Sequence, residues 1–339
     1  MKLKFVVLYI SLIFVFLVVG CSKTPSQPSS TPAWQAINNG LPENTTVQSI
    51  ACAPSDPNII YVGTYSGVYK TKNNGKKWTA CSQDLPLSDV SAVAVHPNDA
   101  SHVYAGTWGR GLSLSKDGGD TWQDIWPDDA QLHITRITTS ILMPDAVWVG
   151  TEKGLYKSND QGVTWSHVYP SGRVTAVSVH PRDPSIAYMG IDIQGTFKST
   201  NGGSSWTKIN NGLYSSGEST AAANSFAFYP GNAQQIFMST GWVDLYKTVN
   251  GGKNWQKTAD LLTELDVKDV VIHPDQPQRL WALTQKDGIY TSKDGGVSWS
   301  PMNDGYPGKR AYDMCSSTGN SVTLYVGTLG HGIYKYDHD

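Results

Sequence analysis

Several carboxylates and basic side chains stand in short polar segments between apolar runs, where side chains are free to do chemistry. Two carboxylates held about 5–10 Å apart can cleave a glycosidic bond. Glu152 could pair in this way with Asp192 or with Asp244. The neighbouring charged residues are Arg110, Arg136, Arg173, Lys268, Asp287 and Arg310. This mixture of charges matches no catalytic motif, and it suits a polar surface that binds a protein or a glycan.

Aromatic residues occupy the same polar segments. Tyr65, Trp108, Trp126 and Trp242 fall outside the repeated positions of the chain. Three more tyrosines share this placement, namely Tyr169, Tyr214 and Tyr306. Exposed aromatic rings anchor protein partners or stack on sugars. The alternative is that these rings are tucked under neighbouring loops.

An internal repeat supplies the elements that must position these residues. A Gly-rich box that ends in Trp occurs six times, for example as SKDGGDTW at 115–122 and SKDGGVSW at 292–299. Successive boxes are 44, 43, 41, 49 and 44 residues apart. Each period holds four short alternating or apolar runs bounded by turn residues, as in VSAVAVHP, HVYAGTW, GLSLSKDGG and DTWQDI. This period and these runs predict a four-stranded propeller blade.

The box is expected to form the turn between the third and fourth strands of each blade. Its Asp or Asn can accept backbone N–H groups, and its Gly takes a left-handed backbone. Its Trp begins the fourth strand and packs between blades, burying on the order of 200 Å². Six copies in one register favour this structural role over calcium ligation or acid catalysis. The box residues are Asn73, Gly75, Trp78, Asp117, Gly119, Trp122, Asp160, Gly162, Trp165, Asn201, Gly203, Trp206, Asn250, Gly252, Trp255, Asp294, Gly296 and Trp299.

These boxes carry a family resemblance. The chain resembles the Asp-box, or BNR, repeat proteins, whose boxes follow the pattern S-x-D-x-G-x-T-W. Three of the six copies keep the Asp, three have Asn, and all six keep the Gly and the Trp. The resemblance covers roughly residues 33–337 and implies a β-propeller.

The ends of the repeat predict seven blades rather than six. Residues after the last box supply three strands and then stop, whereas Trp34 lies 44 residues before Trp78 and begins a fourth-strand-like segment near 33–38. A ring closed by this segment has no free sheet edges. The sequence therefore predicts an all-β fold, a single seven-bladed β-propeller of four-stranded blades over residues 33–339, closed by the N-terminal strand joining the C-terminal blade.

The candidate residues are expected on one face of this disc. In such a blade, the loop between the second and third strands and the loop to the next blade share a face. The exposed aromatic and charged candidates fall on this face or around the expected channel mouth. The longest connection, residues 210–225, lies there too, and long loops in compact domains are usually functional or disordered.

Histidines and cysteines are explained by the repeat. His96, His180 and His273 each precede Pro at the end of a first strand in three separate blades, so they are interpreted as turn residues rather than a metal triad. No metal or cofactor site is predicted.

Cys52 and Cys315 fall in blades one and seven, which are neighbours across the closure. They could form a disulfide or, with Cys81, remain reduced buried thiols.

The first 20 residues have the pattern of a secretory signal peptide, with a basic start and an apolar run at 5–20. The segment before Cys21 resembles the bacterial lipoprotein cleavage box, in which the Cys becomes the lipidated N-terminus. An uncleaved anchor helix is the alternative. Residues 21–32 then form a flexible Ser/Pro-rich tether with a reach on the order of 20 Å. We expect a secreted, lipid-anchored protein at the periplasmic or cell-surface face of a bacterial membrane, touching it through the lipid only.

Composition excludes other classes of protein. The 33 Gly and 12 Trp describe a turn-rich, aromatic-rich globular chain rather than a helical or disordered one. The formal net charge of −2 provides no basic surface for nucleic acid.

Three functions remain open. The first is a monomeric, non-enzymatic scaffold that binds a protein or complex through the loop face, for assembly or stabilisation. It follows from the resemblance to photosystem II assembly-factor propellers and, more distantly, the sortilin ectodomain. The second is a glycoside hydrolase. Sialidases need an Arg before the first box and the first Arg here is Arg110, while xyloglucan-degrading enzymes use two propellers. The third is a glycan-binding module with Trp108, Trp126 and Trp242 as stacking platforms.

Overall fold

The computed structural model describes residues 33–85, 89–126, 132–241, 244–258, 265–308, 310–319 and 321–338. The expected signal peptide, Cys21 and the tether lie outside the described residues, as does Trp242. Every regular element within these ranges is a β-strand, and no membrane-spanning helix is found among them.

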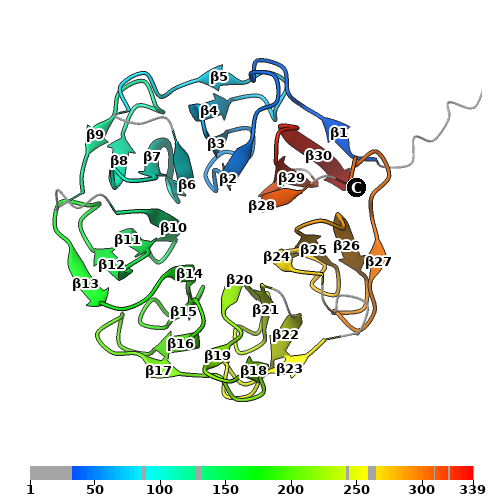
Figure 1. The fold of residues 1–339 in the computed structure, drawn as a ribbon. Coiled ribbons are helices and arrows are strands. Elements are labelled where there is room, and N and C mark those ends of the chain that lie inside the picture. The colour runs from blue at the N-terminus through cyan, green and yellow to red at the C-terminus, as the bar shows by residue number, and fades with distance from the viewer. Residues whose placement is uncertain are drawn as a thin grey trace, which may run out of the picture. The chain divides into compact units, whose positions relative to one another are not determined.

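Seven four-stranded antiparallel sheets stand in a ring (Figure 1). Blade one consists of β2 (Val47–Cys52), β3 (Ile60–Thr64), β4 (Gly67–Thr71) and β5 (Thr79–Ala80). Blade two consists of β6 (Val90–His96), β7 (Asp99–Thr107), β8 (Leu112–Ser115) and β9 (Gln123–Asp124). Blade three consists of β10 (Ile134–Ser140), β11 (Met143–Thr151), β12 (Gly154–Ser158) and β13 (Ser166–Tyr169). Blade four consists of β14 (Val174–Val179), β15 (Ala187–Ile191), β16 (Gly195–Ser199) and β17 (Thr207–Lys208).

The second half of the ring continues the pattern. Blade five consists of β20 (Ala223–Phe228), β21 (Ile236–Thr240), β22 (Leu245–Thr248) and β23 (Gln256–Lys257). Blade six consists of β24 (Val267–Ile272), β25 (Leu280–Thr284), β26 (Ile289–Ser292) and β27 (Ser300–Pro301). Blade seven consists of β28 (Ala311–Thr318), β29 (Val322–Thr328), β30 (Ile333–His338) and β1 (Gln35–Ala36). The predicted seven-bladed propeller is confirmed. A short hairpin of β18 (Ser215–Ser216) and β19 (Ser219–Thr220) stands between blades four and five.

The N-terminal strand closes the ring as the sequence predicts. Gln35 and Ala36 of β1 pair antiparallel with Lys335 and Tyr334 of β30. Trp34 is only 3% exposed and packs in the core shared by blades six and seven. Its backbone N–H donates to Asp304 O (2.8 Å) and its indole N–H to Met302 O (2.8 Å). The chain's beginning therefore joins its two last blades.

A disulfide adds a covalent link at the same junction. Cys52 on β2 is bonded to Cys315 on β28, 263 residues away in the chain. The disulfide hypothesis is confirmed, and the alternative of three reduced thiols is wrong. Cys81 remains a free, buried thiol, and burial raises its pKa to about 12. A thiol with this pKa is inert at neutral pH.

The core lies between blades rather than within one of them. One aromatic side chain from the second strand of each blade is less than 2% exposed, and these are Tyr61, Tyr104, Trp148, Tyr188, Phe237, Trp281 and Tyr325. The interpretation of Trp148 and Trp281 as core residues is confirmed. Because every second strand is buried on both faces, each blade depends on its two neighbours.

The Asp-box turn has the geometry that its residues favour. In blade two, the Asp117 carboxylate accepts the Ser115 hydroxyl (2.8 Å) and the Thr121 backbone N–H (2.9 Å). The Gly119 N–H donates to Ser115 Oγ (2.7 Å), and Gly119 has a left-handed φ of 90°. The indole N–H of Trp122 then donates to the carbonyl of Cys81 in blade one (2.7 Å). The indoles of Trp78, Trp165 and Trp255 make the same bond, to the carbonyls of Ile37, Ile125 and Ile209, so four of the boxes are tied to the preceding blade in this way.

The repeated histidines also have a local role. Nδ1 of His96 accepts the Asn98 N–H (3.2 Å), and Nδ1 of His180 accepts the Arg182 N–H (3.3 Å). Nδ1 of His273 accepts the N–H of Gln276 at 3.0 Å. All three cap the turn after the inner strand, so their interpretation as turn residues is confirmed.

Replacing Trp34 tests the closure. Trp34→Ala is expected to lower the free energy of unfolding by about 3–5 kcal/mol, because it empties a packed site at the closing blade. Trp108→Ala is the matched control, since Trp108 is 57% exposed. Chemical denaturation measures both. Equal effects of the two substitutions would contradict the closing role of Trp34.

The box carboxylates predict a dependence of stability on acid. Hydrogen bonds from Thr121, Thr164 and Ser298 lower the pKa of Asp117, Asp160 and Asp294 from the ordinary 3.8 to about 2. Since the folded pKa is depressed, their contribution is present above about pH 4 and is lost as pH falls towards 2. Replacing all three by Asn, the residue of the other boxes, should reduce the fall in melting temperature between pH 4 and pH 2. An unchanged fall would show that other groups produce it.

Candidate functional site

The inner strands of all seven blades carry a β-bulge at the same place. In each, the first and third residues pair with the neighbouring strand and the second has no partner. The bulge residues are Gln48, Ser91, Thr135, Thr175, Asn224, Lys268 and Tyr312. All seven line one cavity at the mouth of the central channel, which we call the mouth cavity. Bulges re-aim side chains, and here they aim one polar residue per blade at the channel axis.

Most bulge residues bind the next blade. The side chains of Ser91, Thr135 and Thr175 donate to the carbonyl of the first inner-strand residue of the following blade at 2.6–2.7 Å. Gln48 and Asn224 make the same contact at 3.3 and 3.1 Å. Lys268 and Tyr312 depart from this pattern. The Lys268 ammonium instead lies 3.1 Å from Asp266 Oδ1.

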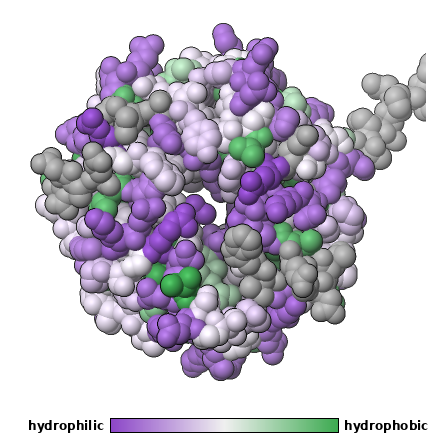
Figure 2. Space-filling view, in the orientation of Figure 1, coloured by the Kyte–Doolittle hydropathy of each residue, from purple (hydrophilic) through white to green (hydrophobic). Residues whose placement is uncertain are grey.

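Positive charge gathers at the mouth. The mouth cavity has a volume of about 270 Å³, and Arg136, Arg173 and Lys268 all line it. His133 and Trp108 form part of its rim. Figure 2 shows hydrophilic residues on several sides of the central opening. Converging cations in a recess favour an acidic ligand group.

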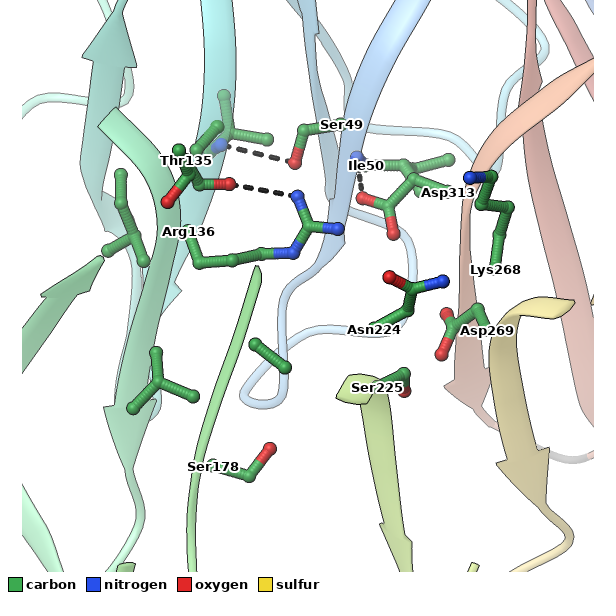
Figure 3. Close-up of a pocket in the computed structure, with 15 residues that line it drawn as sticks. Ser49, Ile50, Thr135, Arg136, Ser178, Asn224, Ser225, Lys268, Asp269 and Asp313 are labelled. Carbon is green, nitrogen blue, oxygen red and sulfur yellow. Dashed lines mark hydrogen bonds between the residues drawn. The ribbon is translucent and has the colours of Figure 1, made fainter. Parts of the chain in front are cut away.

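A second ring lies deeper in the channel. It consists of the third residue of each inner strand, namely Ser49, Ala92, Arg136, Ala176, Ser225, Asp269 and Asp313, around a cavity of about 190 Å³ that we call the neck cavity. Figure 3 shows the Arg136 side chain reaching across this neck towards the side that carries Asp313 and Asp269. Arg136 Nη1 donates to the carbonyl of Thr135 (2.8 Å).

The two neck carboxylates influence each other. Asp313 accepts the Ile50 N–H (2.8 Å), and Asp269 accepts the Val270 N–H (2.8 Å). Burial in the channel raises the pKa of both carboxyls, and repulsion from Asp313 raises that of Asp269 further. Arg136 lowers both values in part. The pair therefore holds a proton at a higher pH than isolated aspartates do.

The expected glycosidase carboxylates do not share a cavity. Glu152 Oε1 lies 2.8 Å from His133 Nδ1, and Asp244 is 4% exposed with its carboxylate 3.0 Å from Lys257 Nζ. Asp192 lines a separate pocket beside the mouth. Within the described ranges, no group of three or more His, Cys, Asp or Glu is placed to hold a metal. Two other carboxylates, Asp269 and Asp313, do line one cavity, the neck cavity. The sequence analysis did not identify them.

The predicted aromatic residues differ in exposure. Tyr65, Trp108 and Tyr214 are 51%, 57% and 55% exposed. Trp126 is half-buried beside Gly111 and contacts Tyr156 and Trp165. Tyr169 is half-buried and Tyr306 is buried. Trp126, Tyr169 and Tyr306 therefore fit the alternative that these rings are tucked away rather than exposed.

The remaining predicted charges lie around the rim. Arg110 and Arg310 are exposed. With its amide oriented to satisfy both neighbours, Gln285 accepts from Arg310 (3.1 Å) and donates to Asp266 (2.9 Å). Because Asp266 also pairs with Lys268, Arg310 is linked to the mouth through two side chains.

Comparison with known proteins identifies the family. Residues 27–305 match the profile of the family described as photosynthesis system II assembly factor YCF48. The chain belongs to this family. A photosystem II assembly lipoprotein Ycf48 from a Synechococcus species is 22% identical over 85% of the chain and 84% of its own length. The structure described as YCF48 bound to D1 peptide superposes with a TM-score of 0.68 at 16% identity, covering 91% of this chain and 98% of that one.

Enzymes with related propellers are also similar. A probable oligoxyloglucan-reducing end-specific xyloglucanase from Neosartorya fischeri is 23% identical over 90% of the chain. The chain spans 47% of the length of that enzyme. The likeness therefore covers about half of the enzyme, whereas it covers 84% of the Synechococcus Ycf48 protein.

The neck pair predicts how stability changes towards neutral pH. Since the folded protein holds this proton more tightly than the unfolded chain, the contribution of the pair is present below about pH 4 and is lost as pH rises through the raised pKa. Asp269→Asn should therefore raise thermal stability at pH 8 relative to wild type, with little gain at pH 4. Asp84→Asn, on an exposed loop, is the control. A gain of equal size at both pH values would contradict the raised pKa.

Proposed function

We propose that the protein is an extracytoplasmic binding scaffold that holds a segment of another protein across the mouth of its channel. The observation that carries this proposal is the mouth cavity, where one bulge residue from every blade and the cations Arg136, Arg173 and Lys268 converge. Family membership supports it, because a protein described as YCF48 has been solved with a bound peptide. Assembly or stabilisation of a larger complex is the task that such binding serves.

The exposed aromatics favour a protein over a glycan. Tyr65 and Trp108 belong to loops of blades one and two, and Tyr214 to the connection between blades four and five. Tyr65 lies near Asp89, and Trp108 and Tyr214 each line a hollow together with Arg173. A sugar-binding groove needs rings that stack along one line. Of the predicted platforms Trp108, Trp126 and Trp242, only Trp108 is an exposed ring among the described residues. An irregular aromatic patch set in charge suits a protein surface.

The membrane location belongs to the proposal. Residues 1–20 are a signal peptide, Cys21 carries the lipid, and residues 21–32 tether the propeller close to the bilayer. The Cys52–Cys315 disulfide supports an oxidising compartment. The names of the lipoprotein relatives support the anchor. The protein then meets its partner at the periplasmic or cell-surface face of the membrane, as a monomer and without a cofactor.

The alternative is a glycan-binding module or glycoside hydrolase of the Asp-box type. The specific observation in its favour is the similarity to xyloglucanases over 90% of the chain. Against it, Glu152, Asp192 and Asp244 do not line one cavity. A glycan array run with the full-length protein separates the two functions.

Reversing a mouth charge tests the scaffold. Arg173→Glu should reduce the partner recovered by crosslinking in native membranes by about tenfold or more, because it places a carboxylate where an acidic segment binds. Lys116→Glu, an exposed charge on a turn of the opposite face, is the matched control. Quantitative mass spectrometry of the crosslinked proteins gives the readout. A strong glycan hit together with no protein whose recovery depends on Arg173 would overturn the proposal.

A further inference from the structure

The connection between blades four and five forms an ordered wall beside the mouth. Its hairpin, β18 and β19, is attached to the neighbouring loop of blade four, where the Thr220 N–H donates to Ile193 O (2.9 Å). At its base, the Ala221 N–H donates to Tyr214 O (3.0 Å), and the Tyr214 N–H donates to the Tyr246 hydroxyl (3.2 Å). The insertion is therefore held by hydrogen bonds to both adjoining blades.

Ile193 on this loop is unusual in its backbone and its exposure. It has a left-handed φ of 58°, which is strained for a β-branched residue, and its side chain is 63% exposed. The loops of blades two and seven have the same length and place Gly109 and Gly330 at this position, also with positive φ. The blade six loop of the same length has Lys286 at this position, so two other blades use glycine where blade four keeps a large apolar side chain in water. A strained, exposed residue of this kind points to a function.

Ile193 and the hairpin enclose a side pocket of about 520 Å³. Tyr214, Ala221 and Ala222 join Ile193 as its apolar wall, and Tyr214 is 55% exposed. Four polar residues also line this pocket and line the mouth cavity as well, namely Arg173, Thr175, Asn224 and Lys268. The side pocket therefore adjoins the mouth cavity, and a chain lying across the mouth can reach into it.

The charges at the shared boundary select an acidic group. Arg173 makes no ion pair with the part of the chain that the structure describes, whereas Lys268 is paired with Asp266. Asp192 is the carboxylate that lines the side pocket. Of the four residues that line both hollows, Arg173 and Lys268 are basic and none is a carboxylate. An acidic side chain is complementary to this boundary.

We propose that the side pocket is the specificity pocket of the scaffold: it takes a large aliphatic or aromatic side chain of an internal, extended partner segment, whose Asp or Glu one or two residues away lies against Arg173. This inference rests on the proposed function and names the chemistry of its partner. Contact with the apolar side chain removes Ile193 and Tyr214 from water, which accounts for the retention of a strained residue.

The test is a selection of random linear peptides displayed on phage, with the full-length protein as bait. Enriched sequences should combine Leu, Ile, Phe or Met with a nearby Asp or Glu. For a synthetic peptide of the enriched sequence, Ile193→Gly and Tyr214→Ala should each weaken binding by about tenfold, the effect of losing one buried apolar contact. Ile193→Gly should leave the melting temperature within about 2 °C of wild type, since relief of strain offsets the flexibility of Gly.

Matched controls make the outcomes distinct. Ile141→Ser, at a 69% exposed residue on the opposite face, should leave the affinity unchanged. Replacing the apolar residue of the peptide by Ser should weaken binding to wild type but not to Ile193→Gly, which is the signature of a direct contact. Amidating the peptide's C-terminus should have no effect, because the carboxylate is a side chain.

Failure of this inference differs from failure of the proposed function. Enriched peptides that depend on Arg173 but bind Ile193→Gly and Tyr214→Ala as tightly as wild type would overturn the specificity pocket and leave the scaffold intact. Loss of binding on amidation would also overturn it, since the chain terminus would then be the ligand. If no peptide is enriched, the proposed function itself is wrong.

Discussion

The pairing of β1 with β30 is the constraint on which the rest of the molecule depends. Each blade buries its second strand against both neighbours, so an open ring would expose two apolar sheet faces and two unpaired edges. Gln35 and Ala36 supply the missing edge, Trp34 fills the adjoining core, and the Cys52–Cys315 bond holds the first and last inner strands together. Closure also fixes the number of inner strands around the axis, and the site is built from those strands.

The sequence predicts the fold because the information for each blade is local. A box such as that of Asp117 satisfies its own turn with hydrogen bonds between residues two to four positions apart, so its whole pattern can recur in six of the seven blades. The phase of the repeat then places Trp34 as the start of a fourth strand. The phase of the repeat also assigns each loop to a face of the disc. It predicts Arg136, Arg173, Lys268 and Asp192 around the channel mouth, and these residues line the mouth cavity or the side pocket beside it.

The site is harder to predict from the sequence than the fold, because each blade contributes a single residue to it. Ser91 or Thr175 looks like any polar residue of a strand, and only the bulge aims it at the axis. Asp269 and Asp313 occupy a position that holds Ser or Ala in most blades, and aligning the inner strands would have revealed them. The exposure of a loop side chain is harder still to predict from the sequence. Trp126 lies in a loop of the same face as Trp108, but contact with Tyr156 and Trp165 half-buries it, which no spacing rule foretells.

Departures from the repeat indicate where function lies. Five bulge residues bind the next blade, and a sixth of the same kind at position 268 would have stabilised the ring further. Lys268 gives up that contact and places an ammonium group where the mouth, the neck and the side pocket meet. Ile193 has an exposed apolar side chain at a position where blades two and seven have glycine, the residue that takes a positive φ without strain. Since both residues sacrifice stability at the same corner of one face, selection for binding explains them better than selection for folding.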